Sequence, residues 1–120
     1  MDNSINKKGL NYKTATLKYA LSSFKKMELV SKLVRGKNVD QAINILMFTP
    51  KKSAKILLKV LKSAVSNYKS KESVSESDLY ISKVDIGQGP KMKRIKYVGR
   101  SRVHPFNKYR SIVRVVLDNK

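Results

Sequence analysis

The sequence predicts an α+β fold, in which a small body of three helices and an antiparallel sheet carries a long protruding β-hairpin. Three observations lead to this prediction. Apolar residues recur with helical spacing between residues 51 and 68. They alternate with polar residues in three shorter segments, as in half-buried strands. Residues 87–109 are strongly basic and have no core of their own. We therefore expect an N-terminal tail at 1–12, a globular body at 13–86 and 110–120, and an extended basic arm at 87–109.

The first strand and the first helix follow each other closely. Residues 13–21 alternate in polarity, and one side of this strand carries Ala15, Leu17, Tyr19 and Leu21. Ser22 and Ser23 are suitable N-cap residues for a helix that ends near Val34. The apolar stripe of that helix consists of Met27, Val30, Leu33 and Val34. Gly36 suits the left-handed C-cap position, and Lys37 beside it faces the negative end of the helix.

Two further helices complete the helical part of the body. Asn38 or Asp40 begins a short helix, whose apolar residues are Ala42, Ile43, Ile45 and Leu46. Thr49 is the expected N-cap of a long helix with Pro50 at its first position. The stripe of this long helix comprises Ala54, Leu57, Leu58, Leu61, Ala64, Val65 and Tyr68. The polar residues 69–78 predict an exposed loop.

The last two strands, at 80–86 and 111–117, flank the arm. Gly87-Gln88-Gly89-Pro90 is expected to break regular pairing, and two basic stretches of similar length around Gly99 predict a hairpin. At about 3.3 Å per residue the arm reaches roughly 40 Å. Because Pro105 lacks an N–H, we expect the pairing to be interrupted or bulged there. A two-stranded ribbon is not independently stable in water, so the arm must rest on a partner.

The charge of the chain indicates that this partner is a polyanion. Lys and Arg number 27, Asp and Glu number 8, and the formal net charge is +19 on 120 residues. No acid lies between residues 86 and 117. A compact fold tolerates such self-repulsion best when an anionic partner supplies the counter-charge. Nucleic acid is the commonest such partner, and an anionic membrane surface or a merely solvated basic surface are the alternatives.

Composition argues against several kinds of chemistry. The chain has no cysteine, which excludes disulfides and thiolate sites. No apolar stretch approaches the roughly 18 residues that span a bilayer, and residues 1–9 lack the apolar region of a secretory signal. The single histidine, His104, has no acidic neighbour to orient it as a catalytic base. No carboxylates are spaced as in a metal site. We therefore expect no enzyme, no cofactor and no metal.

Two places in the body are candidates for phosphate binding. Ser22 and Ser23, followed by Lys25 and Lys26, place hydroxyls and amines at a helix N-terminus, where anions bind readily. Lys51 and Lys52 lie near the start of the next helix, where their positive charges are repelled by the positive end of the helix dipole. An external phosphate would relieve that repulsion, and simple solvation is the alternative.

The cations of the whole chain are mostly Lys, which favours contacts with the phosphate backbone over base reading, in the arm as elsewhere. The candidate contacts are Lys91, Lys93, Arg94, Lys96, Arg100, Arg102, His104, Lys108 and Arg110. Tyr97, Phe106 and Tyr109 either stack on bases or pack across the hairpin, and both interpretations stay open.

Several motifs occur together in order and spacing. They are Leu33-Val34-Arg35-Gly36-Lys37, Phe48-Thr49-Pro50-Lys51-Lys52-x-Ala54, Val60-Leu61-Lys62-Ser63-Ala64-Val65-x-Asn67, Gly89-Pro90-x-Met92-Lys93-Arg94-Ile95 and Ser111-x-Val113-x-Val115-Val116. In combination they resemble the universal large-subunit ribosomal protein of the L-twenty-two family, over about residues 13–118.

The resemblance implies a body on the subunit surface near the nascent-chain exit and a hairpin that threads into large-subunit rRNA. It implies that the hairpin tip lines the exit tunnel near its constriction, close to where macrolide antibiotics bind. The rRNA contacts that it implies are Ser22, Ser23, Lys26, Arg35, Lys37, Lys51, Lys52, Lys93 and Arg94. The tunnel-lining tip corresponds to Gly99, Arg100, Ser101 and Arg102. The sequence departs from the family at Glu28, where a basic residue is usual, and at the tip segment 97–103.

We therefore expect a structural rRNA-binding protein of the large ribosomal subunit, in a bacterial cytoplasm or in an organelle (a mitochondrion or a plastid). It would bind large-subunit rRNA, with Tyr97 among its contacts, support rRNA folding and act as a monomer within the ribosome. Neighbouring large-subunit ribosomal proteins and the nascent polypeptide are the other expected partners. The alternative from another class is a DNA-architectural protein with a basic intercalating arm, in which Pro105 is the wedge.

Overall fold

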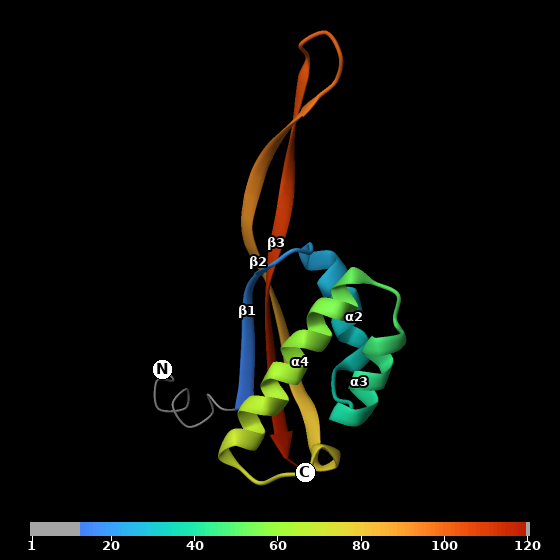
Figure 1. The fold of residues 1–120 in the computed structure, drawn as a ribbon, viewed down its shortest axis with the longest axis vertical. Coiled ribbons are helices and arrows are strands. Elements are labelled where there is room, and N and C mark those ends of the chain that lie inside the picture. The colour runs from blue at the N-terminus through green and yellow to red at the C-terminus, as the bar shows by residue number, and fades with distance from the viewer. Residues whose placement is uncertain (1–12, 120) are drawn as a thin grey trace.

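The computed structural model describes residues 13–119 and confirms the α+β fold (Figure 1). Its elements are β1 (Thr14–Ala20), α2 (Phe24–Val34), α3 (Val39–Phe48), α4 (Lys52–Lys71), the short 3-10 helix η2 (Glu76–Asp78), β2 (Leu79–Tyr97) and β3 (Val103–Asn119). The expected N-terminal tail at 1–12 lies outside the described residues, as does residue 120. Among the described residues no helix is both long and apolar enough to cross a membrane.

The sheet is antiparallel with the strand order β1-β3-β2. β1 pairs only with the body part of β3, from Thr14 opposite Val116 to Ala20 opposite Ser111. Beyond that point β2 and β3 continue alone as a two-stranded ribbon, which projects from the end of the body opposite the C-terminus (Figure 1). The molecule therefore measures 63 × 37 × 20 Å. The exact boundary between body and arm remains a proposal, and we use "arm" for residues 87–109 and "body" for the other described residues.

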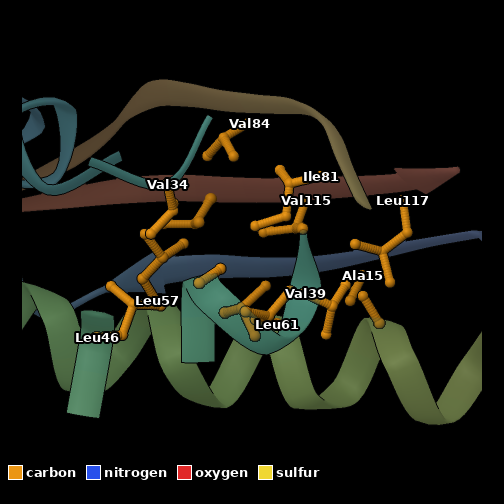
Figure 2. Close-up of a cluster of buried hydrophobic side chains, with 14 of the residues drawn as sticks. Ala15, Val34, Val39, Leu46, Leu57, Leu61, Ile81, Val84, Val115 and Leu117 are labelled. Carbon is orange, nitrogen blue, oxygen red and sulfur yellow. The ribbon is translucent and has the colours of Figure 1, made fainter. Parts of the chain in front are cut away.

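The core of the body lies between the three helices and one face of the sheet. Figure 2 shows Leu57 and Leu61 of α4 pointing toward strand residues such as Val115 and Leu117, with Val34 of α2 beside them. These side chains are almost completely buried. The predicted stripe of α4 therefore packs as expected, and hydrophobic burial holds the helices on the sheet.

The caps of the helices differ in part from the prediction. Gly36 adopts the expected left-handed conformation (φ +78°) after α2. Thr49, in contrast, does not start α4. It is the C-cap of α3, its hydroxyl donates to the Ile45 carbonyl over 2.6 Å, and Lys51 is the N-cap of α4. The prediction was wrong because a threonine can satisfy the end of one helix as well as the start of the next.

Two further corrections concern helix extents and exposure. The segment 69–78 is not wholly a loop, since α4 continues to Lys71 and η2 spans Glu76–Asp78. Leu33, expected in the buried stripe of α2, is 44% exposed, and Ser31 takes a buried position instead. The Ser31 hydroxyl is compatible with that position because it donates to the Glu28 carbonyl over 2.8 Å.

The strand β1 does not keep the predicted alternation. Ala15 is buried, but Leu17, Tyr19 and Leu21 are exposed, and Ala20 is buried in their place. Tyr19 has a positive φ of 64°, and the pairing with β3 shifts register between Leu17 and Ala20. Because of this irregularity Ala20 points inward where regular alternation would place Tyr19. Side chains alternate between the two faces of a strand only while its register is unbroken.

The arm forms the predicted hairpin, but Pro105 does not interrupt it. Pairing is unbroken from Lys91 opposite Tyr109 to Tyr97 opposite Val103, and Ile95 faces Pro105 within that run. At the turn the Val98 N–H donates to the carbonyl of residue 102. Since hydrogen-bonded pairs alternate with non-bonded ones, the proline falls on a non-bonded pair, where its nitrogen faces the outer edge. The expected break near residues 87–90 is present as a register shift between Gln88 and Lys91.

Candidate nucleic-acid interface

The strongest candidate for a binding site is a cleft where the arm leaves the body. It has a volume of about 710 Å³. Three segments that are distant in sequence line it: Ser23, Phe24, Lys25 and Lys26 from the start of α2, Gln88, Gly89 and Lys91 from β2, and Tyr109 and Arg110 from β3. In Figure 1, α2 begins at the end of the body from which the ribbon projects. The fold thus gathers four cations around one hollow, which we call the junction cleft.

The start of α2 gives the junction cleft its preference for anions. Ser23 is the N-cap, as predicted, but its side chain makes no capping hydrogen bond, and the first turn of the helix contains no acid. Backbone N–H groups at a helix start carry partial positive charge and favour an anion. Lys25 and Lys26 are exposed beside them. This wall of the cleft therefore offers both N–H donors and ammonium groups to a phosphate.

The opposite wall depends on a close approach of the two arm strands. A Cβ on Gly89 would lie 3.1 Å from the carbonyl oxygen of Arg110, which is too close without a backbone shift. The Arg110 Nη1 donates to the Tyr19 carbonyl over 3.2 Å. Its Nε is buried and has no hydrogen-bond partner among the described residues. The positive φ of Tyr19, which broke the alternation of β1, thus presents the carbonyl that holds Arg110 in place.

The starts of α2 and α4 are tied together by a serine pair. The buried hydroxyls of Ser22 and Ser53 are 2.7 Å apart. Ser22 therefore positions the two helix starts. Lys51 and Lys52 are exposed at the start of α4. Lys52 also lines a second hollow of about 460 Å³ between β1 and α4, with Lys59 and Arg110.

The Arg35-Gly36-Lys37 turn has a structural role that its sequence did not reveal. It docks on β2, because the Gly36 N–H donates to the Ile81 carbonyl and the Ile81 N–H donates to the Lys37 carbonyl. The Arg35 guanidinium donates to the Val84 carbonyl over 2.9 Å and to Glu28 Oε1 over 3.0 Å. The unusual acid at position 28 thus has an intramolecular partner. Lys37 remains exposed.

The arm presents its cations to solvent. None of its residues is buried, and it contains no acid. Alternation along the paired strands divides the side chains between two faces. One, the Arg94 face, carries Met92, Arg94, Lys96, His104, Phe106 and Lys108. The other, the Tyr97 face, carries Lys91, Lys93, Ile95, Tyr97, Val103, Pro105, Asn107 and Tyr109.

The tip is a tight turn with an unusual backbone. The N–H of Arg102 donates to the Gly99 carbonyl over 2.9 Å. Gly99, Arg100 and Ser101 all have positive φ angles of 54°, 42° and 62°. Two consecutive non-glycine residues in the left-handed region are uncommon. The four residues expected to form the tip do occupy the turn, and Arg100 and Arg102 are exposed there.

The four cations that line the junction cleft are all predicted contact residues, whereas its uncharged lining was not predicted. Phe24, Gln88 and Gly89 of the junction cleft, and Lys59 of the second hollow, were not predicted as site residues. Gly89-Pro90 was interpreted as a break in pairing and as part of a family motif, and neither interpretation predicts that Gly89 lines a cleft. The Lys91 ammonium lies 5.7 Å from the ring centroid of Tyr109, so this ring has a cationic neighbour across the hairpin. Among residues 13–119 no group of three or more His, Asp or Glu side chains is placed to hold a metal.

Comparison with known proteins places these features in a family. The family model described as ribosomal protein L22p/L17e matches residues 15–118. A large ribosomal subunit protein uL22 from Caldicellulosiruptor saccharolyticus is 38% identical over 107 residues, which cover 89% of this chain and 88% of the relative. The uL22 protein of Thermotoga sp. is 40% identical over 106 residues, covering 88% of this chain and 67% of the relative. That of Clostridium novyi is 41% identical over 106 residues, covering 88% and 96%.

Proposed function

Because the chain belongs to the ribosomal protein L22p/L17e family, we propose that it binds large-subunit rRNA through the junction cleft and the arm. As a member of this family it is a structural constituent of the ribosome and not an enzyme. The rRNA contact and the tunnel role described below are our proposal. One observation carries it: the junction cleft unites cations from three separate segments at the base of an arm that contains no acid.

The proposed mode of binding is backbone contact. In the junction cleft, Lys25, Lys26, Lys91 and Arg110 surround a hollow that an RNA phosphate can enter, and the N–H groups at the start of α2 add donors. Phosphate contacts fix the position and orientation of the protein without reading sequence. Lys37, Lys51 and Lys52 extend the contact over the body. Ser22 and Arg35 contribute by positioning, since their polar groups bond within the chain.

The arm carries the contact away from the body. Its cations neutralise phosphates along the ribbon, which removes their mutual repulsion and supports the folding of the RNA around it. We propose that the tip, residues 99–102, reaches the nascent-peptide exit tunnel and lines it. There the exposed Arg100 and Arg102 would face the passing polypeptide.

Neighbouring large-subunit ribosomal proteins are the second class of proposed partner. Phe48, at the end of α3, is 82% exposed, and Met47 beside it is also exposed. Exposed apolar side chains of this size suit a protein contact more than a phosphate. We propose that the protein acts as a monomer within the ribosome. We also propose that this ribosome is of bacterial type, because the relatives named above come from bacteria. That ribosome lies in a bacterial cytoplasm or in an organelle.

The DNA-architectural alternative is not favoured by any observation. Family membership supports a ribosomal role. In addition, Pro105 lies in the paired shaft opposite Ile95 and not at the apex of the turn, where a wedge would enter a duplex.

The test is a salt titration of binding to an isolated fragment of large-subunit rRNA. With on the order of ten phosphate contacts, affinity should fall by several decades between about 50 and 200 mM salt. The double variant Lys25→Gln/Lys26→Gln should reduce the slope of log affinity against log salt by about 1.4 to 1.8. The matched control, Lys69→Gln/Lys71→Gln, removes the same charge at the other end of the body and should leave the slope unchanged.

Two results would contradict the proposal. A wild-type slope equivalent to one or two contacts would reject backbone tracking altogether. Equal loss in the two double variants would show that the junction cleft has no special part in binding. Co-sedimentation with large subunits through a high-salt gradient is the complementary measurement in cells.

A further inference from the structure

The half of the arm nearest the tip has two chemically different surfaces. On the Tyr97 face, Ile95, Tyr97, Val103 and Pro105 form two adjacent cross-strand pairs. We call these four residues the apolar strip. On the Arg94 face at the same level lie Arg94, Lys96 and His104, together with the Phe106 ring opposite Arg94. Net charge alone does not require this separation, because the same residues in another register would mix cations and apolar groups on both sides.

The side chains of the apolar strip are close together and accessible. Its two pairs are of the non-hydrogen-bonded type, in which opposing side chains approach most closely. Tyr97 is 79% exposed, Ile95 60% and Val103 47%. No charged side chain of the paired strands lies on this face beyond Lys93. The strip is therefore a continuous apolar surface that no described part of the chain covers.

Of the three aromatic rings of the arm, Tyr97 is the one best placed to accept a flat ligand. The Tyr109 ring already has the Lys91 ammonium near it. Phe106 is less exposed and lies on the Arg94 face among cations. Tyr97 is the most exposed of the three, and Ile95 and Val103 flank it with aliphatic surface.

We propose that the apolar strip binds unstacked bases of single-stranded RNA, with Tyr97 as the stacking platform, while the Arg94 face neutralises phosphates. This inference rests on the proposed function and deepens it. Bases splayed from a single strand stack on aromatic rings, and cations nearby hold the backbone. An RNA loop around the ribbon presents both groups at once, so the two faces of the arm match the two chemical halves of the ligand.

Charge and size favour RNA over a protein partner for the strip. Four side chains supply far less surface than the roughly 1,200 to 2,000 Å² that a specific protein interface buries. Cations border the strip at Lys93 and at the tip, and they attract a polyanion to this place. A protein segment, such as a passing nascent chain, is the competing occupant that the experiment must separate from RNA.

The experiment uses the full chain and three probes: a short oligoadenylate, an RNA duplex of equal length, and an abasic ribose-phosphate chain of equal charge. Tyr97→Ala should weaken oligoadenylate binding by roughly 5- to 150-fold, with the salt slope unchanged. Tyr97→Phe, which keeps the ring, should bind like the wild type. Neither variant should change binding of the abasic chain or of the duplex.

The matched control is Lys96→Ala, one residue away on the Arg94 face. It should reduce the salt slope by about 0.7 with the single-stranded probes, the abasic chain included. The contrast between the two neighbouring positions separates base stacking from phosphate contact.

Each other outcome has a definite meaning. If Tyr97→Ala binds oligoadenylate like the wild type while Lys96→Ala weakens it, the inference is wrong and the proposed function stands. If Tyr97→Ala weakens the abasic chain equally, the tyrosine supports the arm and not a base, which also overturns the inference. If the wild type shows no salt-dependent binding to any RNA, the proposed function itself fails. A separate measurement is cross-linking of the arm to a nascent chain in ribosomes. If Tyr97→Ala reduces that cross-linking but binds every RNA probe like the wild type, the strip contacts protein and the inference is wrong.

Discussion

The body and the arm share two strands, β2 and β3, but they owe their order to different interactions. Within the body, alternate residues of these strands are buried under the helices, for example Val84 and Val113. Within the arm the same strands remain paired, yet no residue is buried. Strand pairing thus extends well past the last buried side chain. We infer that the hydrophobic core stabilises the pairing of β2 and β3 within the body. In the arm, which has no core, the same pairing needs a binding partner.

Their charges differ in the same way. In the body, acids compensate some of the cations through four ion pairs: Lys13–Asp118, Arg35–Glu28, Lys69–Glu76 and Lys83–Asp85. The arm contains seven Lys and Arg residues and no acid. The body can therefore exist as a folded unit in free solution, whereas the arm carries unrelieved repulsion until an anion arrives.

The largest expected contrast is in amide exchange of the free protein. Protection should end near Ile86 and resume near Ile112, because the arm has neither burial nor counter-charge. Core amides open only with global unfolding, so their exchange should be about 10³-fold or more slower than that of arm amides. Hydrogen exchange followed by NMR measures this ratio directly. Uniform protection through Gly99 would show that the arm is ordered without a partner and would break the comparison.

The second contrast is one of stability, measured by urea unfolding. Leu61→Ala removes a buried side chain between α4 and the sheet and should cost about 2 to 5 kcal/mol. Ile95→Ala makes a similar truncation on the exposed arm and should change the unfolding free energy by less than about 0.5 kcal/mol. A large loss from Ile95→Ala would mean that the arm contributes to the folded state of the free chain.

A third comparison separates the shaft of the arm from its tip. Lys93→Glu/Arg94→Glu places repulsion against phosphates along the shaft and should impair incorporation into large subunits. Deletion of residues 99–102 removes only two cations, Arg100 and Arg102, at on the order of 1 kcal/mol each, and should leave incorporation intact. Because we propose that the tip lines the exit tunnel, we expect the deletion to alter the passage of a nascent chain or the binding of a macrolide instead. Both variants are compared in the same cells. If the deletion abolishes incorporation while the charge reversal is tolerated, the tip anchors the arm in the subunit and the shaft does not.

The smallest expected effect is a pH dependence confined to the body. Burial raises the pKa of the Tyr68 hydroxyl, the Lys13 ammonium offsets part of the rise, and the carboxylates of Glu72 and Asp118 add to it. The folded state therefore keeps the proton where the unfolded chain begins to lose it, near pH 10. Stability should fall as pH rises through that value toward the folded pKa.

Tyr68→Phe removes this ionisation, so its unfolding free energy should fall less steeply with alkaline pH than that of the wild type. The matched control is Tyr97→Phe on the exposed arm, which should leave the slope unchanged. Denaturant unfolding between about pH 9 and pH 11 makes the measurement. Identical slopes for the wild type and Tyr68→Phe would mean that the phenol is not protected by burial.

Local patterns in the sequence predicted the type and order of the main helices and strands, and they indicated an anionic partner. The i, i+3, i+4 stripe of α4 predicts a packed helix because only one face of a helix can meet the sheet. The acid-free segment between residues 86 and 117 predicts an anionic partner, because its net positive charge attracts a polyanion however the two strands pair. Gly36 and Gly99 mark turns that need positive φ, which is a property of single residues.

Tertiary structure decided which of these residues meet. No local pattern brings the start of α2, Gly89 and Arg110 to one cleft, because their proximity depends on how α2 packs beside the root of the ribbon. The register shift after Leu17 and the positive φ of Tyr19 bury Ala20 in place of Tyr19, whose carbonyl accepts from Arg110. In the arm, pairing register alone places Pro105 where its missing N–H costs nothing and separates the apolar strip from the Arg94 face. Register is a relation between two strands, so one strand read by itself does not contain it.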